Sequence, residues 1–93
     1  MITKEEAKKI GDDLLRNSDI EYETLYDVDK ISFFNEKEIL SGKEKGSNKD
    51  VYMYSFTQIW GIEERGLGLY IDAHSGEPLY IITPHGYIDI EAK

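Results

Sequence analysis

The stretch from Gly66 to Ile82 constrains the fold most, because it contains two runs of β-forming residues joined by their own turn. In the first run apolar residues recur at every second position and so share one face of a strand. These residues are Leu67, Leu69, Ile71 and Ala73. The Asp72 carboxylate can accept amides of the following turn, and Gly76 stands where a short loop commonly needs a positive φ. Residues 79–83 then form the returning strand, which predicts an antiparallel hairpin.

A helix is predicted over residues 3–17. Thr3 and Glu6 have the spacing of a capping box, in which each side chain accepts the backbone amide of the other residue. A narrow apolar stripe follows at helical spacing, and we expect it to pack on the sheet. It consists of Ala7, Ile10, Gly11, Leu14 and Leu15. Glycine costs about 1 kcal/mol relative to alanine inside a helix, so Gly11 indicates close approach of the helix backbone to a strand.

The middle of the chain contains two further strand patterns. Residues 20–28 alternate in a way that predicts a strand with one solvated face, and residues 51–60 predict a strand with large side chains on both faces. We expect the second of these in the middle of the sheet, with the helix on one side and aromatic residues presented on the other. Residues 29–40 fit either a continued strand or a helical turn, and both remain open. Residues 41–50 lack any apolar side chain, which predicts a mobile loop or a hairpin tip.

The C-terminal part of the chain adds one more predicted turn and one more predicted strand. Pro84 lies in a predicted turn at 83–86, and residues 87–90 fit a short edge strand. A chain of 93 residues has room for one domain, so residues 1–93 form a single α+β domain. We expect an N-terminal helix packed on an antiparallel β-sheet meander of about four strands.

The acidic composition limits the partners that this chain can bind. It has 19 acidic and 11 basic residues, a formal net charge of −8, which disfavours nucleic acids and anionic lipid and favours encounter with basic proteins. The acids are dense between residues 12 and 29, where Arg16 is the single basic residue. That stretch is either a solvated face or a docking face for a cationic partner. The predicted partner-binding residues are Glu21, Tyr22, Glu23, Tyr26, Asp27 and Asp29.

The sequence contains few residue patterns typical of catalytic or metal-binding sites. The plausible set is Asp72, His74, His85 and Asp89, since imidazole and carboxylate groups suit a divalent cation. Two histidines in two turns are weak support, and Asp72 is better explained as a turn acceptor. Ser75 follows His74 directly, a spacing that does not normally allow the hydrogen bonds of a nucleophile and its base. We therefore expect no catalytic residue, no metal and no cofactor.

The sequence also bears on location. The N-terminus has no basic region followed by an apolar run, and no stretch approaches the roughly 18 apolar residues of a membrane helix. There is no cysteine, which is neutral for a cytosolic protein. We expect a cytoplasmic protein, or one of the cell envelope if a signal peptide was removed.

Three segments together resemble the PepSY family. They are the threonine-led helix Thr3–Ile10, the tyrosine-bearing strand Val51–Phe56 and the strand and turn Leu69–Leu79, which contains Asp-Ala-His-Ser-Gly-Glu. The resemblance implies an accessory envelope module that restrains a peptidase and has no catalytic residues. A similar strand-turn-strand ending occurs in small cytosolic immunity proteins that neutralise bacterial toxins, and an acidic chain suits that class.

Two functions therefore follow as hypotheses. The first is a non-enzymatic inhibitor, of the immunity type, that neutralises a basic toxin or enzyme through an acidic surface. The alternative is a PepSY-like envelope domain that restrains a peptidase. A small enzyme or metal binder is the third and least favoured class.

Overall fold

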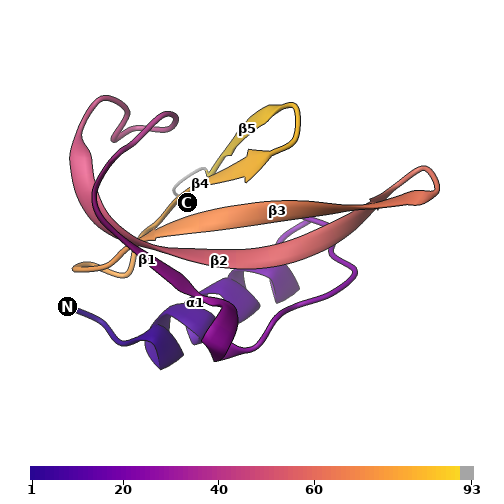
Figure 1. Ribbon diagram of the computed structural model, residues 1–93, viewed down its shortest axis with the longest axis horizontal. Helices are drawn as coiled ribbons and strands as arrows, with labels where there is room; N and C mark the ends of the chain where they lie inside the picture. Colours follow the sequence, from indigo (N-terminus) through magenta and orange to yellow (C-terminus); the bar gives the residue numbers. More distant parts are fainter. Residues whose placement is uncertain (91–93) are drawn as a thin grey trace.

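The computed structural model describes residues 1–90 of the 93-residue chain, as one α-helix and a five-stranded antiparallel sheet (Figure 1). The strands follow one another in the sheet in chain order, so the sheet is a simple meander. The elements are α1 (Lys4–Arg16), a short 3-10 turn η1 (Val28–Lys30), β1 (Ser32–Glu38), β2 (Asn48–Trp60), β3 (Glu63–Asp72), β4 (Pro78–Thr83) and β5 (Gly86–Asp89). This confirms the α+β class. The sheet has five strands where about four were expected, because β1 lies in the segment that the sequence left open.

The helix forms where the sequence predicts it. The Glu6 amide donates to Thr3 Oγ1 at 3.1 Å, and the Thr3 amide donates to Glu6 Oε1 at 3.0 Å, which completes the capping box. The helix ends at Asn17, whose amide donates to the Asp13 carbonyl. Within residues 1–90, no helix is both long and apolar enough to cross a membrane.

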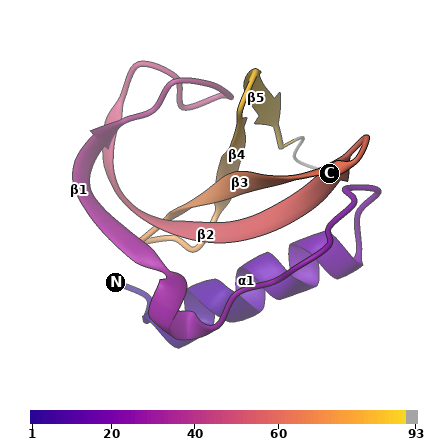
Figure 2. The same cartoon turned by 45° about the vertical axis from the view of Figure 1, so that its right-hand side comes forward.

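The sheet is strongly curled, and α1 covers its convex face (Figure 2). The predicted stripe of β3 is buried beneath the helix, together with Ala7 and Leu15 of α1. Gly11 lies directly against the Tyr54 ring of β2. A Cβ atom there would stand 2.6 Å from the ring atoms Cγ and Cε2. The close approach predicted from Gly11 is confirmed, and its partner is an aromatic side chain.

The position of the β2 aromatic residues corrects one expectation. We expected them on the face opposite the helix, but Tyr52, Tyr54 and Phe56 are buried in the core cluster under α1. The reason is that Gly11 leaves room for the Tyr54 ring, while the Tyr52 hydroxyl donates to the Ile2 carbonyl at 2.9 Å. The opposite, concave face of β2 carries smaller or more flexible side chains.

The strand predicted over residues 20–28 is wrong. This segment runs along the edge of β2 and makes one isolated bridge, between Leu25 and Phe56, before η1 begins. Ile20, Leu25 and Val28 are the residues that pack against the core, and they do not lie at every second position. The period-two pattern therefore did not correspond to the buried side of this segment.

Residues 29–40, whose secondary structure the sequence left open, and the polar residues 41–50 both contribute to the β1–β2 hairpin. Residues 32–38 form β1, whose pairing with β2 shifts between Phe34 and Lys37, and Glu36 adopts a positive φ of 49° at this bulge. The polar stretch 41–50 is a hairpin tip, as predicted, although its last three residues already belong to β2.

The turn between β3 and β4 was predicted correctly. Gly76 has a φ of 78°, and the Asp72 Oδ1 atom accepts the amides of His74 at 2.8 Å and Ser75 at 3.2 Å. The turn at 83–86 is confirmed as well, since Thr83 pairs with Gly86.

Replacing Gly76 by valine is expected to lower the free energy of unfolding by roughly 1–2 kcal/mol or more. A β-branched residue is strained at positive φ, and its Cβ would stand 3.1 Å from Ile10 Cδ1. Urea unfolding measures the loss. His74→Ala in the same turn should change stability little, because its contact with Asp50 lies at the surface. Equal losses from the two changes would contradict this account of the turn.

Candidate functional site

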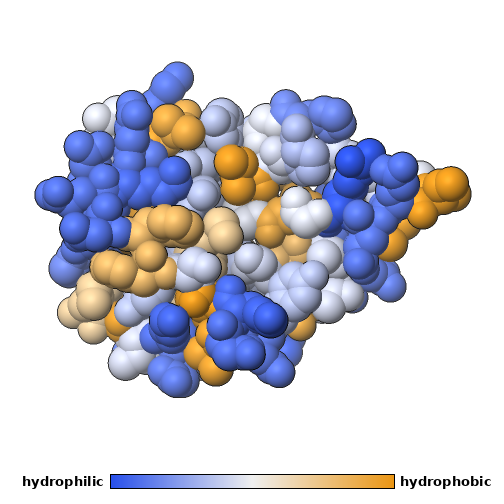
Figure 3. All heavy atoms as spheres, viewed as in Figure 1, coloured by the Kyte–Doolittle hydropathy of each residue, from blue (hydrophilic) through white to orange (hydrophobic). Residues whose placement is uncertain are grey.

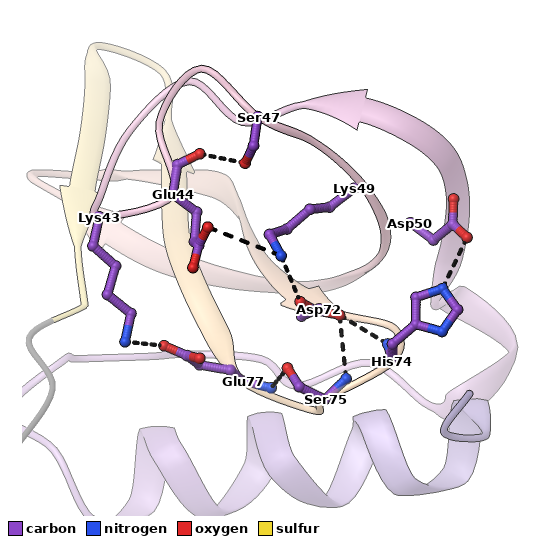
Figure 4. Close-up of polar contacts among 9 residues, drawn as sticks. All are labelled: Lys43, Glu44, Ser47, Lys49, Asp50, Asp72, His74, Ser75 and Glu77. Carbon is purple, nitrogen blue, oxygen red and sulfur yellow. Dashed lines mark hydrogen bonds and ion pairs between the residues drawn. The ribbon is translucent and has the colours of Figure 1, made fainter.

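A cluster of charged side chains joins the β1–β2 hairpin to the β3–β4 turn, at the end of the molecule shown in Figure 4. We call it the polar clasp. Lys49 Nζ lies 3.2 Å from Asp72 Oδ2, Lys43 Nζ lies 2.6 Å from Glu77 Oε1, and His74 Nε2 lies 3.0 Å from Asp50 Oδ2. Each of the three pairs connects two different parts of the chain. The clasp therefore holds the curled hairpin against the turn.

The two aspartates of the clasp have lowered pKa values. Burial alone would raise the pKa of Asp72, but the amides of His74 and Ser75 and the ammonium of Lys49 outweigh it. The hydrogen bond from the Glu36 amide makes the largest contribution to lowering the pKa of Asp50, and the hydrogen bond with His74 makes the next largest. Both carboxylates are thus held ionised by partners within the chain. This suits a structural tie better than a catalytic acid or base.

The residues considered for metal binding do not come together. Asp72 and His74 lie in the clasp, His85 stacks on Trp60 with ring centroids 5.4 Å apart, and Asp89 accepts a hydrogen bond from the Ser41 hydroxyl. In the part of the chain that the structure describes, no group of three or more potential ligands could hold a metal ion.

The Ser75 hydroxyl does not make a nucleophile contact with its neighbour. Its Oγ accepts the Glu77 amide at 3.2 Å, as part of the turn. His74 Nε2 is directed to Asp50 instead (Figure 4).

The acidic segment, residues 19–29, is fixed to the edge of β2 by its backbone. The Glu23 amide donates to the Thr57 carbonyl at 2.7 Å, and the Thr57 amide donates to the Thr24 carbonyl at 3.0 Å. The Gln58 side chain donates to the Glu21 carbonyl at 2.8 Å. The segment is therefore an ordered part of the surface, although it is not the predicted strand.

All six predicted partner-binding residues are exposed on this segment. Tyr22 and Tyr26 keep 40% and 37% of their surface exposed, which is large for aromatic side chains. Among residues 1–90, the four carboxylates of this set take part in no ion pair and no side-chain hydrogen bond. They are Glu21, Glu23, Asp27 and Asp29. Their negative charge is thus directed to the outside, in contrast to the paired carboxylates of the clasp.

Thr57 is a residue of this region that the sequence did not single out. It is buried, and its Oγ1 accepts the Thr24 amide at 3.0 Å and donates to Glu64 Oε2 at 3.3 Å. It therefore ties the acidic segment to β2 and β3. A threonine among the large residues of a central strand was the available signal, because a buried hydroxyl needs partners.

The chain gave no significant match to any family model, curated protein or solved structure. The PepSY resemblance stays a prediction.

Proposed function

We propose that this protein is a non-enzymatic inhibitor that binds and neutralises a basic protein, as an immunity protein does with a toxin or enzyme. The observation that carries the proposal is the set of four carboxylates that make no ion pair within residues 1–90, on a backbone held to β2, with Tyr22 and Tyr26 exposed among them. Exposed charges of one sign raise the rate of encounter with an oppositely charged partner. Tyrosine is among the residues that most often anchor protein interfaces.

Order in the segment favours binding over simple solvation. A solvating stretch has no need of a fixed backbone, whereas a docking surface loses less conformational entropy when its groups are already in place. The hydrogen bonds to Thr57 and Gln58 supply that order. The carboxylates then steer association, and the tyrosines slow dissociation.

Changing Glu21, Glu23, Asp27 and Asp29 together to their amides is expected to slow association about tenfold or more at low salt. The salt dependence of the association rate should also flatten, since screening acts over about 8 Å at physiological ionic strength. The melting temperature should stay close to that of the parent, because these four carboxylates make no ion pair within the described residues 1–90. Binding kinetics against the product of the neighbouring gene, at two salt concentrations, measure this.

The control variant removes charges elsewhere. The exposed residues Glu5, Glu36 and Glu38 serve this purpose when changed to glutamine, because within residues 1–90 their carboxylates make no ion pair. A partner that binds the segment variant as fast as the parent at both salts would contradict the proposal. A peptidase as the bound partner would favour the alternative of an accessory domain that restrains it.

A further inference from the structure

A groove of about 440 Å³ lies on the inside of the curled sheet, across β2, β3 and β4. Tyr26 of the acidic segment forms part of its wall, with Met53 and Ile82. Its volume falls within the roughly 300–1,000 Å³ that ligand pockets in proteins have. The lining of the groove includes no residue of the clasp and none of the four carboxylates of the acidic segment.

The groove exists because the inside of the curve is filled at one end only. Near the clasp, the second core cluster packs the concave face with Ile39, Val51, Tyr70, Leu79 and Tyr80. Further along β2 and β3, the directly paired residues are small. Ser55 pairs with Gly68, and Thr57 pairs with Gly66.

The floor at Gly66 is open space. A Cβ atom on this residue would meet no other atom within 4 Å, and its φ is not positive. The backbone conformation therefore does not require glycine here. A glycine inside a strand is often found where a ligand or another backbone approaches closely.

Apolar side chains and glycines form most of the groove's lining, and acidic residues stand next to lining residues in the chain. Tyr26 belongs both to the wall and to the acidic segment, and Asp27 follows it directly. At the next inward position of β3 beyond Gly66, the Glu64 carboxylate accepts a hydrogen bond from Thr57. Ile59, opposite Glu64, and Ile62 are exposed near the β2–β3 hairpin tip. In Figure 3 hydrophilic atoms separate the apolar atoms at the tip, on the right, from those in the middle of this face.

We propose that the groove receives an apolar side chain of the partner, carried on a segment flanked by lysine or arginine. This rests on the proposed function and names the chemistry that the site recognises. The apolar wall matches the inserted side chain, and the carboxylates beside Tyr26 and at Glu64 match the flanking cations. A second copy of this chain fits less well, because its net charge of −8 would repel the same carboxylates.

Two synthetic peptides test the proposal on the parent protein. They are acetyl-Lys-Lys-Leu-Phe-Lys-Lys-amide and the matched acetyl-Glu-Glu-Leu-Phe-Glu-Glu-amide. The lysine peptide should shift the NMR amide signals of Gly66, Gly68 and Ile82 and bind at least tenfold more tightly than the glutamate peptide. Shifts confined to residues 21–29 would overturn the groove. Concentration-dependent shifts at the groove without peptide would mean that a second copy occupies it, and would also overturn the proposal.

Gly66→Leu fills the groove from within and should weaken binding of the lysine peptide at least tenfold. Asn35→Leu is the matched control, since it adds an exposed leucine to β1 without a change in charge, and binding should be unchanged. Equal affinity of Gly66→Leu and the parent would overturn the groove.

The same variants separate this proposal from the proposed function when the neighbouring gene's product is the partner. A partner that needs the acidic segment but tolerates Gly66→Leu contradicts the groove alone. A partner that binds the amide variant and Gly66→Leu as it binds the parent contradicts both.

Discussion

Replacing Gly11 by alanine is expected to destabilise the protein by about 2 kcal/mol, although the same change inside an ordinary helix stabilises it by about 1 kcal/mol. The new Cβ would stand 2.6 Å from the Tyr54 ring atoms Cγ and Cε2, well inside contact distance. That ring cannot easily move aside. It is buried under α1, and its hydroxyl donates to the Asp12 carboxylate on the next residue of the helix. Urea unfolding followed by far-UV circular dichroism measures the change.

Gly66→Ala is the control, because it makes the same substitution where no atom lies within 4 Å. It should leave stability unchanged or raise it by up to about 1 kcal/mol, since alanine restricts the unfolded chain. The two glycines are therefore expected to give changes of opposite sign. A gain in stability for Gly11→Ala would contradict the packing of α1 on β2.

The parts of the fold that the sequence predicted are those determined by neighbouring residues. The capping box needs only Thr3 and Glu6, and the β3–β4 turn needs only Asp72 and Gly76, so each could be inferred from a few adjacent positions. The buried face of β3 was predicted because its alternation continues over four apolar residues.

The predictions that were wrong concern features that depend on contacts between residues far apart in the sequence. The alternation in residues 20–28 resembles a strand, but β2 offers this segment a partner only near Phe56 and Thr57. Likewise both faces of β2 carry apolar side chains, so the pattern alone could not tell which face the helix covers. The fit of Tyr54 to Gly11 decides it.

The surface was predicted in part. Charge density is visible in the sequence, and all six acidic and aromatic residues predicted to bind a partner are exposed. The groove could not be predicted, because the register of three strands brings Ser55, Gly68 and Ile82 together. The two glycines in the β3 pattern were the available signal.

Replacing Asp72 by alanine is expected to lower the free energy of unfolding by about 2–4 kcal/mol. Asp72 is 8% exposed, and its carboxylate accepts two turn amides and the ammonium of Lys49. Alanine would leave those amides without their acceptor and would loosen the clasp. Asp27→Ala is the matched control, because Asp27 is exposed and makes no side-chain hydrogen bond at the start of η1. Its effect should stay within about 0.5 kcal/mol.

The same carboxylate makes stability depend on pH. A carboxyl group with a lowered pKa stabilises the folded state above its unfolded pKa of about 3.9, and this contribution is lost as pH falls through the folded pKa. Asp12 and Asp50 have lowered pKa values as well, so the parent should lose stability below about pH 4. In Asp72→Ala one of the three contributions is absent, and the loss between about pH 5 and pH 3 should be smaller than in the parent. Urea unfolding at several pH values tests this. Parallel pH profiles for the two proteins would mean that Asp72 titrates normally and that the clasp does not hold its charge.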